Sequence, residues 1–127
     1  MNAPLPTERQ VQRSILAMCG VAFPDVFVTH VPNGAHLAGS SVARFKQIGA
    51  LKGDGLKVGF PDLLALWSGG GALLEVKRPK LGRVSPEQKA LHARLEAVGW
   101  PVAVVTSDRE AFAALRDRGA PVGVVWG

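Results

Sequence analysis

One stretch of the chain, residues 59–77, constrains the fold more than any other. Its first part, residues 59–67, is an apolar run entered through Pro61, and its last part, residues 72–77, is a second apolar run. Three consecutive glycines, 69–71, supply a turn between them. Two apolar runs joined by a short glycine-rich turn indicate a β-hairpin. Since apolar residues occupy both faces of both runs, we expect this hairpin in the interior of a sheet.

The same hairpin carries three charged residues, Asp62, Glu75 and Lys77. Side chains alternate along a strand, so Glu75 and Lys77 share a face. If an even number of residues closes the hairpin, Leu64 lies across from Glu75 and Asp62 lies across from Lys77, and all three charges share that face. A slip of one residue moves Asp62 to the opposite face. The closing pair in such a hairpin is Trp67 with Ala72, or Ser68 with Gly71.

Charged groups inside a sheet need a physical reason. Two carboxylates about 4 Å apart repel by roughly 4 kcal/mol at an effective dielectric near 20, and a divalent cation offsets this repulsion. Oxygen ligands suit hard ions such as magnesium or manganese. The sequence therefore favours a metal-binding carboxylate pair at Asp62 and Glu75. The alternative is a same-face ion pair of Glu75 with Lys77 on an edge strand.

The residues before the hairpin predict helix, strand and helix. Thr7 and Gln10 form a capping box for a helix that ends at Gly20. A strand is expected over residues 26–31 and a loop over 32–39. Ser40 or Ser41 caps a second helix to about Leu51, and residues 52–59 form a glycine-rich loop.

The residues after the hairpin predict two more helices and two more strands. Ser85 caps a helix with Pro86 at its first position and Gln88 completing a capping box. Its expected buried stripe is Leu91, Leu95 and Val98. The remaining expected elements are a buried strand over 102–105, a helix from Ser107 to Gly119, and a last strand over 122–126. The predicted order is α-β-α-β-β-α-β-α-β.

Composition places the chain among soluble single-domain proteins. Its 127 residues, 47% of them apolar, fit one domain over residues 1–127 with a substantial core. No apolar run approaches a bilayer span, and the first residues do not resemble a secretory signal. We therefore expect a cytoplasmic protein. The single cysteine, Cys19, lies among the apolar residues of the first helix and is interpreted as core filling.

Positive charge is placed near the acidic motif. The net charge is +5 and the isoelectric point is near 10.0. Phosphate groups would be attracted to such a region, although solvated surface is the alternative for each residue. The three histidines are scattered without metal-ligand spacing and are expected to be structural or at the surface. His92 is the exception, because it lies one helical turn after Gln88. The basic residues flanking the motif are Lys52, Lys57, Lys77, Arg78, Lys80 and Arg83.

An ordered set of short motifs resembles the VRR-Nuc (virus-type replication-repair nuclease) domain of the PD-(D/E)XK, or restriction-endonuclease-like, superfamily. The resemblance extends from Glu8 to about Val105 and is closest to the stand-alone phage and bacterial type. It implies an α/β fold with a central mixed sheet of about four or five strands flanked by helices. The motifs are residues 32–34 (Pro-Asn-Gly), 59–63, 75–77 and 82–88, followed by a helix that ends in Gly99.

The resemblance also implies a DNA endonuclease that uses Mg²⁺ or Mn²⁺ and leaves 5′-phosphate and 3′-hydroxyl ends. Asp62, Glu75 and the backbone carbonyl of Val76 would bind the metal, and Lys77 would orient the attacking water. Glu8 matches an acidic position that often completes the metal shell, although a first-turn acid also suits the helix dipole. Gln88 matches a glutamine that commonly reaches the site, a role that competes with its capping box. Asn33 lies in a matched loop and joins the basic residues as a DNA-contacting candidate.

A domain of this size has little surface for reading bases, so recognition of DNA shape is expected. Branched DNA such as four-way (Holliday) junctions or flaps is the predicted substrate, with no nucleotide cofactor and no membrane partner. Symmetric cleavage of a junction requires two active sites and hence a homodimer. Residues 120–126 and Trp100 are candidates for its interface, or else residues 120–126 form a core strand. The alternatives are an archaeal-type Holliday-junction resolvase, or a non-catalytic DNA-binding or assembly module that kept the nuclease fold.

Overall fold

Four strands form one mixed sheet with helices on both faces, within the residues that the computed structural model describes, 4–32 and 39–124. The strand order is β1-β2-β3-β4, with β1–β2 and β2–β3 antiparallel and β3–β4 parallel. This confirms the predicted α/β architecture. The elements are α1 (Glu8–Ala22), β1 (Phe27–His30), α2 (Ser41–Gly53), β2 (Leu63–Trp67), β3 (Gly70–Val76), α3 (Pro86–Ala97), β4 (Val102–Val105) and α4 (Asp108–Asp117).

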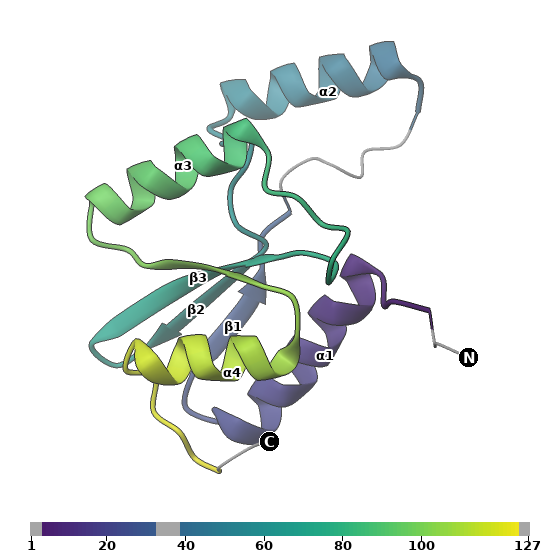
Figure 1. Cartoon of the computed structure of the whole chain (residues 1–127). Helices are drawn as coiled ribbons and strands as arrows, with labels where there is room; N and C mark the ends of the chain where they lie inside the picture. Colours follow the sequence, from purple (N-terminus) through teal and green to yellow (C-terminus); the bar gives the residue numbers. More distant parts are fainter. Residues whose placement is uncertain (1–3, 33–38, 125–127) are drawn as a thin grey trace.

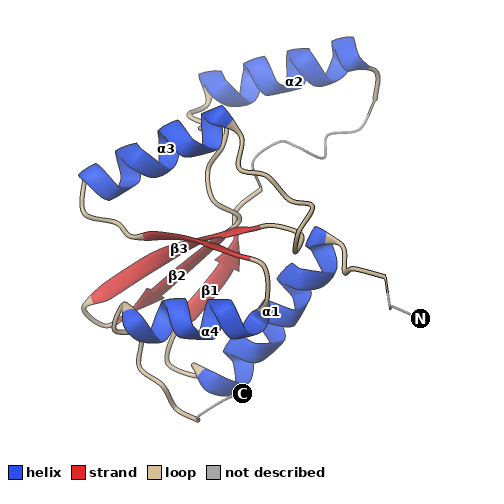
Figure 2. Cartoon of the chain, in the orientation of Figure 1, coloured by secondary structure: helices blue, strands red, loops and turns tan. Residues whose placement is uncertain are grey.

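The helices divide between the two sides of the sheet (Figure 1). Helices α1 and α4 cover one face, and α3 lies over the other, with α2 farther out on the same side as α3 (Figures 1 and 2). The parallel pair β3–β4 is connected through α3, as a parallel pair requires a crossover. The sheet therefore has a face toward α1 and α4, here called the packed face, and a face toward α3, here called the open face.

The hydrophobic core lies on the packed face. The side chains of Phe23 in α1 and Phe112 in α4 meet with ring centroids 5.4 Å apart. At the surface, the Ser14 hydroxyl donates to Asp108 Oδ2 at 2.6 Å and connects the same two helices. Cys19 is buried in this core and burial raises its pKa to about 11, which confirms its interpretation as core filling. The largest fully buried apolar side chains are Phe23, Ile15, Met18, Leu63, Leu74, Leu115, Val76 and Val105.

The hairpin forms with a two-residue turn, Ser68-Gly69, so an even number of residues closes it, which is the condition for the three charged residues to share a face. Trp67 pairs with Gly70, however, rather than with Ala72. Gly69 has φ +87°, a conformation that glycine adopts without strain, and this allows the tight turn. The predicted pairs of Leu64 with Glu75 and Asp62 with Lys77 are therefore wrong by two residues. Because the shift is even, the predicted sharing of one face is preserved.

The predicted helix starts are confirmed. Thr7 and Gln10 form a reciprocal capping box at α1, and Ser85 and Gln88 form another at α3. Ser40 caps α2 and Ser107 caps α4 through hydroxyl groups that accept from backbone N–H groups. These local hydrogen bonds satisfy donors that a helix leaves open at its N-terminus.

Two expectations near the C-terminus are wrong. Helix α3 buries Leu91 alone, while Leu95 is half-buried and Val98 is 71% exposed, because α3 lies over the polar end of the open face. No strand forms over the described part of the last segment, residues 122–124, where Gly123 N–H donates to the Ala22 carbonyl at the end of α1. Residues 125–127 lie outside the described part. Among the described residues, no helix combines the length and apolar character needed to cross a membrane.

Candidate functional site

Two carboxyl groups lie next to each other on the open face at the end of the hairpin. Continuing the register from Leu63 and Leu74 places Asp62 directly across from Glu75. The Glu75 side chain is fully buried and Asp62 is 8% exposed. Asp62 Oδ2 accepts a hydrogen bond from the Val76 N–H at 2.7 Å, and the Asp62 carboxyl group lies close enough to Glu75 to raise the pKa of that residue. The structure therefore places the two predicted acidic residues opposite each other on the two sides of the hairpin.

Three further side chains surround the Glu75 carboxyl group. The Gln88 Nε2 group donates to Glu75 Oε2 at 3.3 Å, and His92 Nε2 lies 2.9 Å from Glu75 Oε1. Lys77 Nζ lies 4.0 Å from Glu75 Oε2, with only 11% of the lysine side chain exposed. The site thus combines two carboxyl groups, an ammonium group, an amide and an imidazole, from the hairpin and α3.

Burial sets the charge state of this cluster. It raises the pKa of Glu75 to about 9, with further contributions from the hydrogen bond and the charge of Asp62. The charge of Lys77 opposes this increase, and that of Glu8 adds to it. Burial also lowers the pKa of His92, and Lys77 lowers it further. Without a cation the acidic pair therefore holds a proton near neutral pH, and His92 remains uncharged.

Helix α3 positions Gln88 for two tasks at once. Its Oε1 atom accepts from the Ser85 N–H at 2.8 Å as part of the capping box, while its Nε2 group reaches Glu75. The competition that the sequence suggested between these roles does not arise, because opposite ends of the amide serve them. His92 follows one turn later and reaches the same carboxyl group, so the spacing from Gln88 was the signal for its place in the site.

The main chain of Asp62 is held by the neighbouring strand. Its carbonyl accepts from the Val31 N–H at 2.8 Å and lies 3.0 Å from His30 Nδ1. Gln12 Nε2 in turn lies 3.3 Å from the same imidazole nitrogen. His30 therefore contacts the backbone of the acidic motif rather than its carboxyl group, a role that the sequence pattern did not indicate.

The loop after β3 folds back over Lys77. A side chain at Gly82 would come within 2.7 Å of Lys77 Cβ and 2.8 Å of the Arg78 nitrogen, so only glycine permits this close approach. Arg78 Nε donates to the Pro6 carbonyl at 3.0 Å, which connects this loop to the segment before α1. Arg78 is thus partly engaged in holding the chain together, although the sequence suggested a DNA contact.

The other DNA-contacting candidates have different positions. Lys52 and Lys57 are exposed at the end of α2 and in the loop after it. Lys80 and Arg83 are exposed in the loop after β3, where Arg83 Nη1 donates to the Lys80 carbonyl at 3.0 Å. Asn33, like His36, lies outside the described residues. The described candidates are therefore split between two regions, the end of α2 with the loop after it and the loop after β3.

The donor set fits a magnesium or manganese ion. Asp62 and Glu75 supply carboxylate oxygen atoms as ligands. When both are ionised, their buried negative charges repel each other, and a divalent cation would offset this repulsion. Within the described residues, no group of three or more histidine, cysteine, aspartate and glutamate side chains is arranged to hold a metal ion. Two carboxylates nevertheless suffice for Mg²⁺, which usually keeps several of its waters. Glu8 is close enough to affect the pKa of Glu75, but it does not complete such a group.

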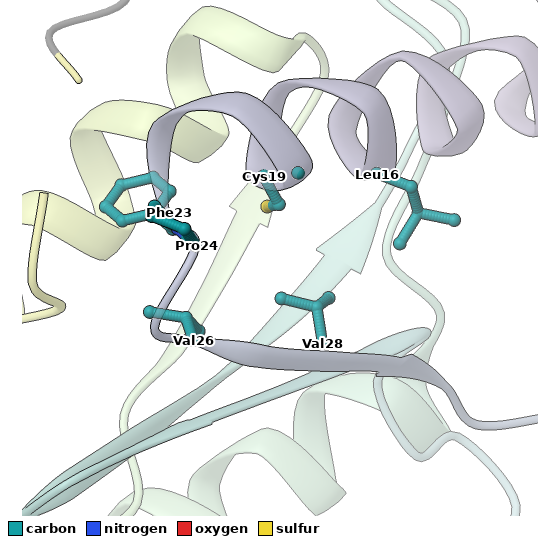
Figure 3. A pocket seen from close by; sticks show the side chains of 7 residues that line it. Leu16, Cys19, Phe23, Pro24, Val26 and Val28 are labelled. Carbon is teal, nitrogen blue, oxygen red and sulfur yellow. The ribbon is translucent and has the colours of Figure 1, made fainter. Parts of the chain in front are cut away.

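A separate pocket of about 330 Å³ lies on the packed face, between the end of α1 and β1 (Figure 3). Its lining is apolar apart from main-chain atoms, and it contains neither of the site carboxyl groups. It is therefore not the candidate active site. The lining residues are Leu16, Cys19, Gly20, Phe23, Pro24, Val26 and Val28.

Comparison with known proteins agrees with this geometry. The family model described as VRR-NUC domain matches residues 7–109, most of the chain. The chain belongs to the VRR-NUC domain family. This is a nuclease family, and the match includes the hairpin, the loop after it and all of α3. No curated protein is significantly similar to the chain.

Proposed function

We propose that this VRR-NUC protein is a metal-dependent DNA endonuclease that hydrolyses phosphodiester bonds. The observation that carries the proposal is the buried Asp62–Glu75 pair with Lys77 beside it, at the end of a central hairpin. Burying two acids and a lysine together is costly unless a ligand uses them. The nuclease family supplies the reaction class, and the side chains supply the groups that the reaction needs.

In this proposal Asp62 and Glu75 hold Mg²⁺ or Mn²⁺ together with the carbonyl group of Val76. Glu8 stands nearby as a further candidate ligand, since its charge already acts on Glu75. A bound divalent ion lowers the pKa of a water ligand and offsets negative charge on the phosphate. Gln88 and His92 hold the Glu75 carboxyl group from the side of α3 and fix the directions of its oxygen atoms.

Lys77 is proposed to orient the attacking water and to place a positive charge beside the phosphate. Its side chain is mostly buried and its main-chain N–H donates to the Val105 carbonyl at 3.0 Å, so the ammonium group has a defined position. Attack of water on phosphorus with departure of the 3′ oxygen would leave 5′-phosphate and 3′-hydroxyl ends. Preorganised charge of this kind avoids the cost of reorganising solvent during the reaction.

Branched DNA, such as four-way junctions or flaps, is the proposed substrate, and a homodimer in the cytoplasm the proposed form of the protein. The small domain offers exposed basic residues, which would contact phosphates and so favour recognition of backbone shape. Trp100, 43% exposed, and Val124, 54% exposed, leave apolar surface near the C-terminus for an interface. Trp126, the other aromatic candidate, lies outside the described residues.

A cleavage assay with matched variants tests the proposal. Purified protein is incubated with linear, flap, nicked and four-way DNAs in magnesium, manganese or a chelator. Asp62→Asn and Lys77→Ala are expected to lower the cleavage rate by about 100-fold or more, the scale for losing a positioned catalytic group. Asp25→Asn is the matched control, because Asp25 also follows a proline but is exposed.

The outcomes separate the possible functions. Cleavage that requires metal and is lost in both site variants, but not in Asp25→Asn, supports the endonuclease. DNA binding without cleavage in any metal would contradict it and indicate the non-catalytic DNA-binding module. Cleavage that survives Asp62→Asn would place the reaction at another site or in a contaminant.

A further inference from the structure

Helix α2 differs from every other described helix because it buries none of its residues. Phe45 is 80% exposed and Val42 is 66% exposed. A phenylalanine normally buries most of its large apolar surface, and its exposure on a regular helix indicates a surface that meets something else. The helix itself is regular, with Ser40 accepting from the Ala43 N–H at 3.1 Å.

The outward face of α2 forms a platform around the Phe45 ring. Gly49 lies one turn after Phe45 and Lys52 two turns after it, so these three positions share a face. A side chain built at Gly49 would meet no atom within 4 Å, so open space adjoins the ring. Glycine in a helix costs about 1 kcal/mol relative to alanine. A flat aromatic group beside an empty position suits a planar ligand.

The charge around this platform favours a polyanion. Arg44 and Lys46 flank Phe45, and Lys52 and Lys57 follow at the end of α2 and in the next loop. Asp54 is the single acidic residue between positions 41 and 57. Proteins that bind single-stranded nucleic acid commonly combine basic residues with exposed aromatic side chains. The bases stack on the aromatic rings and the phosphates contact the cations. A second copy of this basic helix would instead be repelled.

The platform is connected to the active site. The segment after α2 leads directly to Asp62, and on the way Gly59 touches the first turn of α3, where an added side chain would lie 3.0 Å from Gln88 N. Helix α2 also stands on the same side of the sheet as α3 (Figure 1). DNA held on α2 would therefore be held on the side of the sheet that carries Glu75.

We propose that Phe45 stacks on an unpaired base while the basic residues of α2 hold the adjoining phosphates. The platform would select DNA with a single-stranded branch, such as a flap, over continuous duplex. This inference deepens the proposed function and rests on DNA being the substrate.

Binding measured without cleavage tests the platform independently of catalysis. Fluorescence anisotropy with a single-stranded oligonucleotide in chelator is expected to give about tenfold weaker binding for Phe45→Ala, the scale of losing one stacked base. Phe45→Trp should restore binding, because indole also stacks. Phe27→Ala is the matched control, because Phe27 is also a strongly exposed phenylalanine, at 66%, but lies on β1 outside the platform; this variant should bind as the native protein does.

Cleavage assays then measure the selectivity. Phe45→Ala should lower the ratio of flap cleavage to linear duplex cleavage by about tenfold. Unchanged binding and selectivity in Phe45→Ala would overturn the inference. So would a lower molar mass of Phe45→Ala in light scattering without DNA, since that assigns the platform to a second copy. If the protein binds DNA through Phe45 but never cleaves it, the proposed endonuclease activity is contradicted and the inference about the platform still holds.

Discussion

The two faces of the sheet are built in different ways. The packed face is closed by α1 and α4 with a continuous apolar cluster. On the open face Leu66 of β2 and Val104 of β4 remain 40% and 46% exposed, and α3 buries only Leu91 against it. The packed face therefore supplies most of the hydrophobic stabilisation, and the open face carries the groups that we propose to bind metal and to react.

Strand β3 belongs to both faces at once. Leu74 and Val76 point into the core cluster, and Glu75 between them points to the open face, as the alternation of a strand requires. The carboxyl group thus sits on a backbone that is fixed by core packing on its other side. Burying a polar site costs stability, but here the site does not disturb the core, because successive side chains of one strand point to opposite faces of the sheet.

Truncating one buried residue on each face tests most directly whether the packed face supplies most of the stability. Ile15→Ala, on the packed face, is expected to reduce the free energy of unfolding by about 3 to 5 kcal/mol, as for fully buried aliphatic residues. Leu91→Ala is expected to reduce it by about 2 kcal/mol, because Leu91 is 9% exposed whereas Ile15 is fully buried. Urea denaturation monitored by circular dichroism measures both values.

Activity should respond in the opposite order. Below its melting temperature Ile15→Ala is expected to cleave DNA normally, whereas Leu91→Ala loosens the helix that carries Gln88 and His92 and should cleave more slowly. Equal losses of stability, or a larger loss in Leu91→Ala, would show that the open face carries as much of the fold as the packed face.

The pH dependence of stability measures how the buried Glu75 carboxyl group on the open face affects folding. Its pKa is about 9 in the folded protein and near the ordinary 4.5 when unfolded. Between these values the folded state keeps a proton that the unfolded state has lost, so stability falls as the pH rises. For one proton the slope approaches about 1.4 kcal/mol per pH unit. Glu75→Gln should flatten this slope while abolishing cleavage.

Thermal melts between pH 5 and pH 9 in chelator measure the effect. Magnesium should stabilise the native protein most at the alkaline end, because binding to the ionised pair displaces the shared proton. The same melts with Asp25→Asn serve as the control, since that carboxyl group is exposed. Native protein and Glu75→Gln with parallel pH profiles would contradict the assignment of the proton to this pair.

Local patterns predicted most of this fold. All four helix caps are short-range hydrogen bonds between neighbours in sequence, so the residues at each cap suffice to identify it. The sharing of one face by Glu75 and Lys77 followed from the alternation of strands, and that of Asp62 with them depended on an even number of residues in the hairpin closure, which the structure has. The register was missed by two residues, because three glycines permit several turns and the side-chain pattern repeats every two residues.

Long-range features were less predictable. The stripe through Leu95 and Val98 looked buried, but its burial depends on what lies opposite, and α3 faces a polar site there. His92 and His30 lie far from the acidic motif in sequence, and the first was marked only by its spacing from Gln88. Whether Lys77 and Glu8 act as the family resemblance implies stays a prediction.

The smallest expected effect comes from removing one cap on each face. Ser85 caps α3 and Ser107 caps α4 through the same kind of bond, each 3.1 Å from the backbone N–H that it accepts. Ser85→Ala and Ser107→Ala should each cost about 1 kcal/mol of stability. Only Ser85→Ala should slow cleavage, because losing the bond from the Gln88 backbone N–H to Ser85 Oγ loosens the first turn of α3, which carries the Gln88 amide that contacts Glu75. Equal cleavage by the two variants would mean that α3 is aimed by Leu91 and His92 instead, and that its cap belongs to the fold alone.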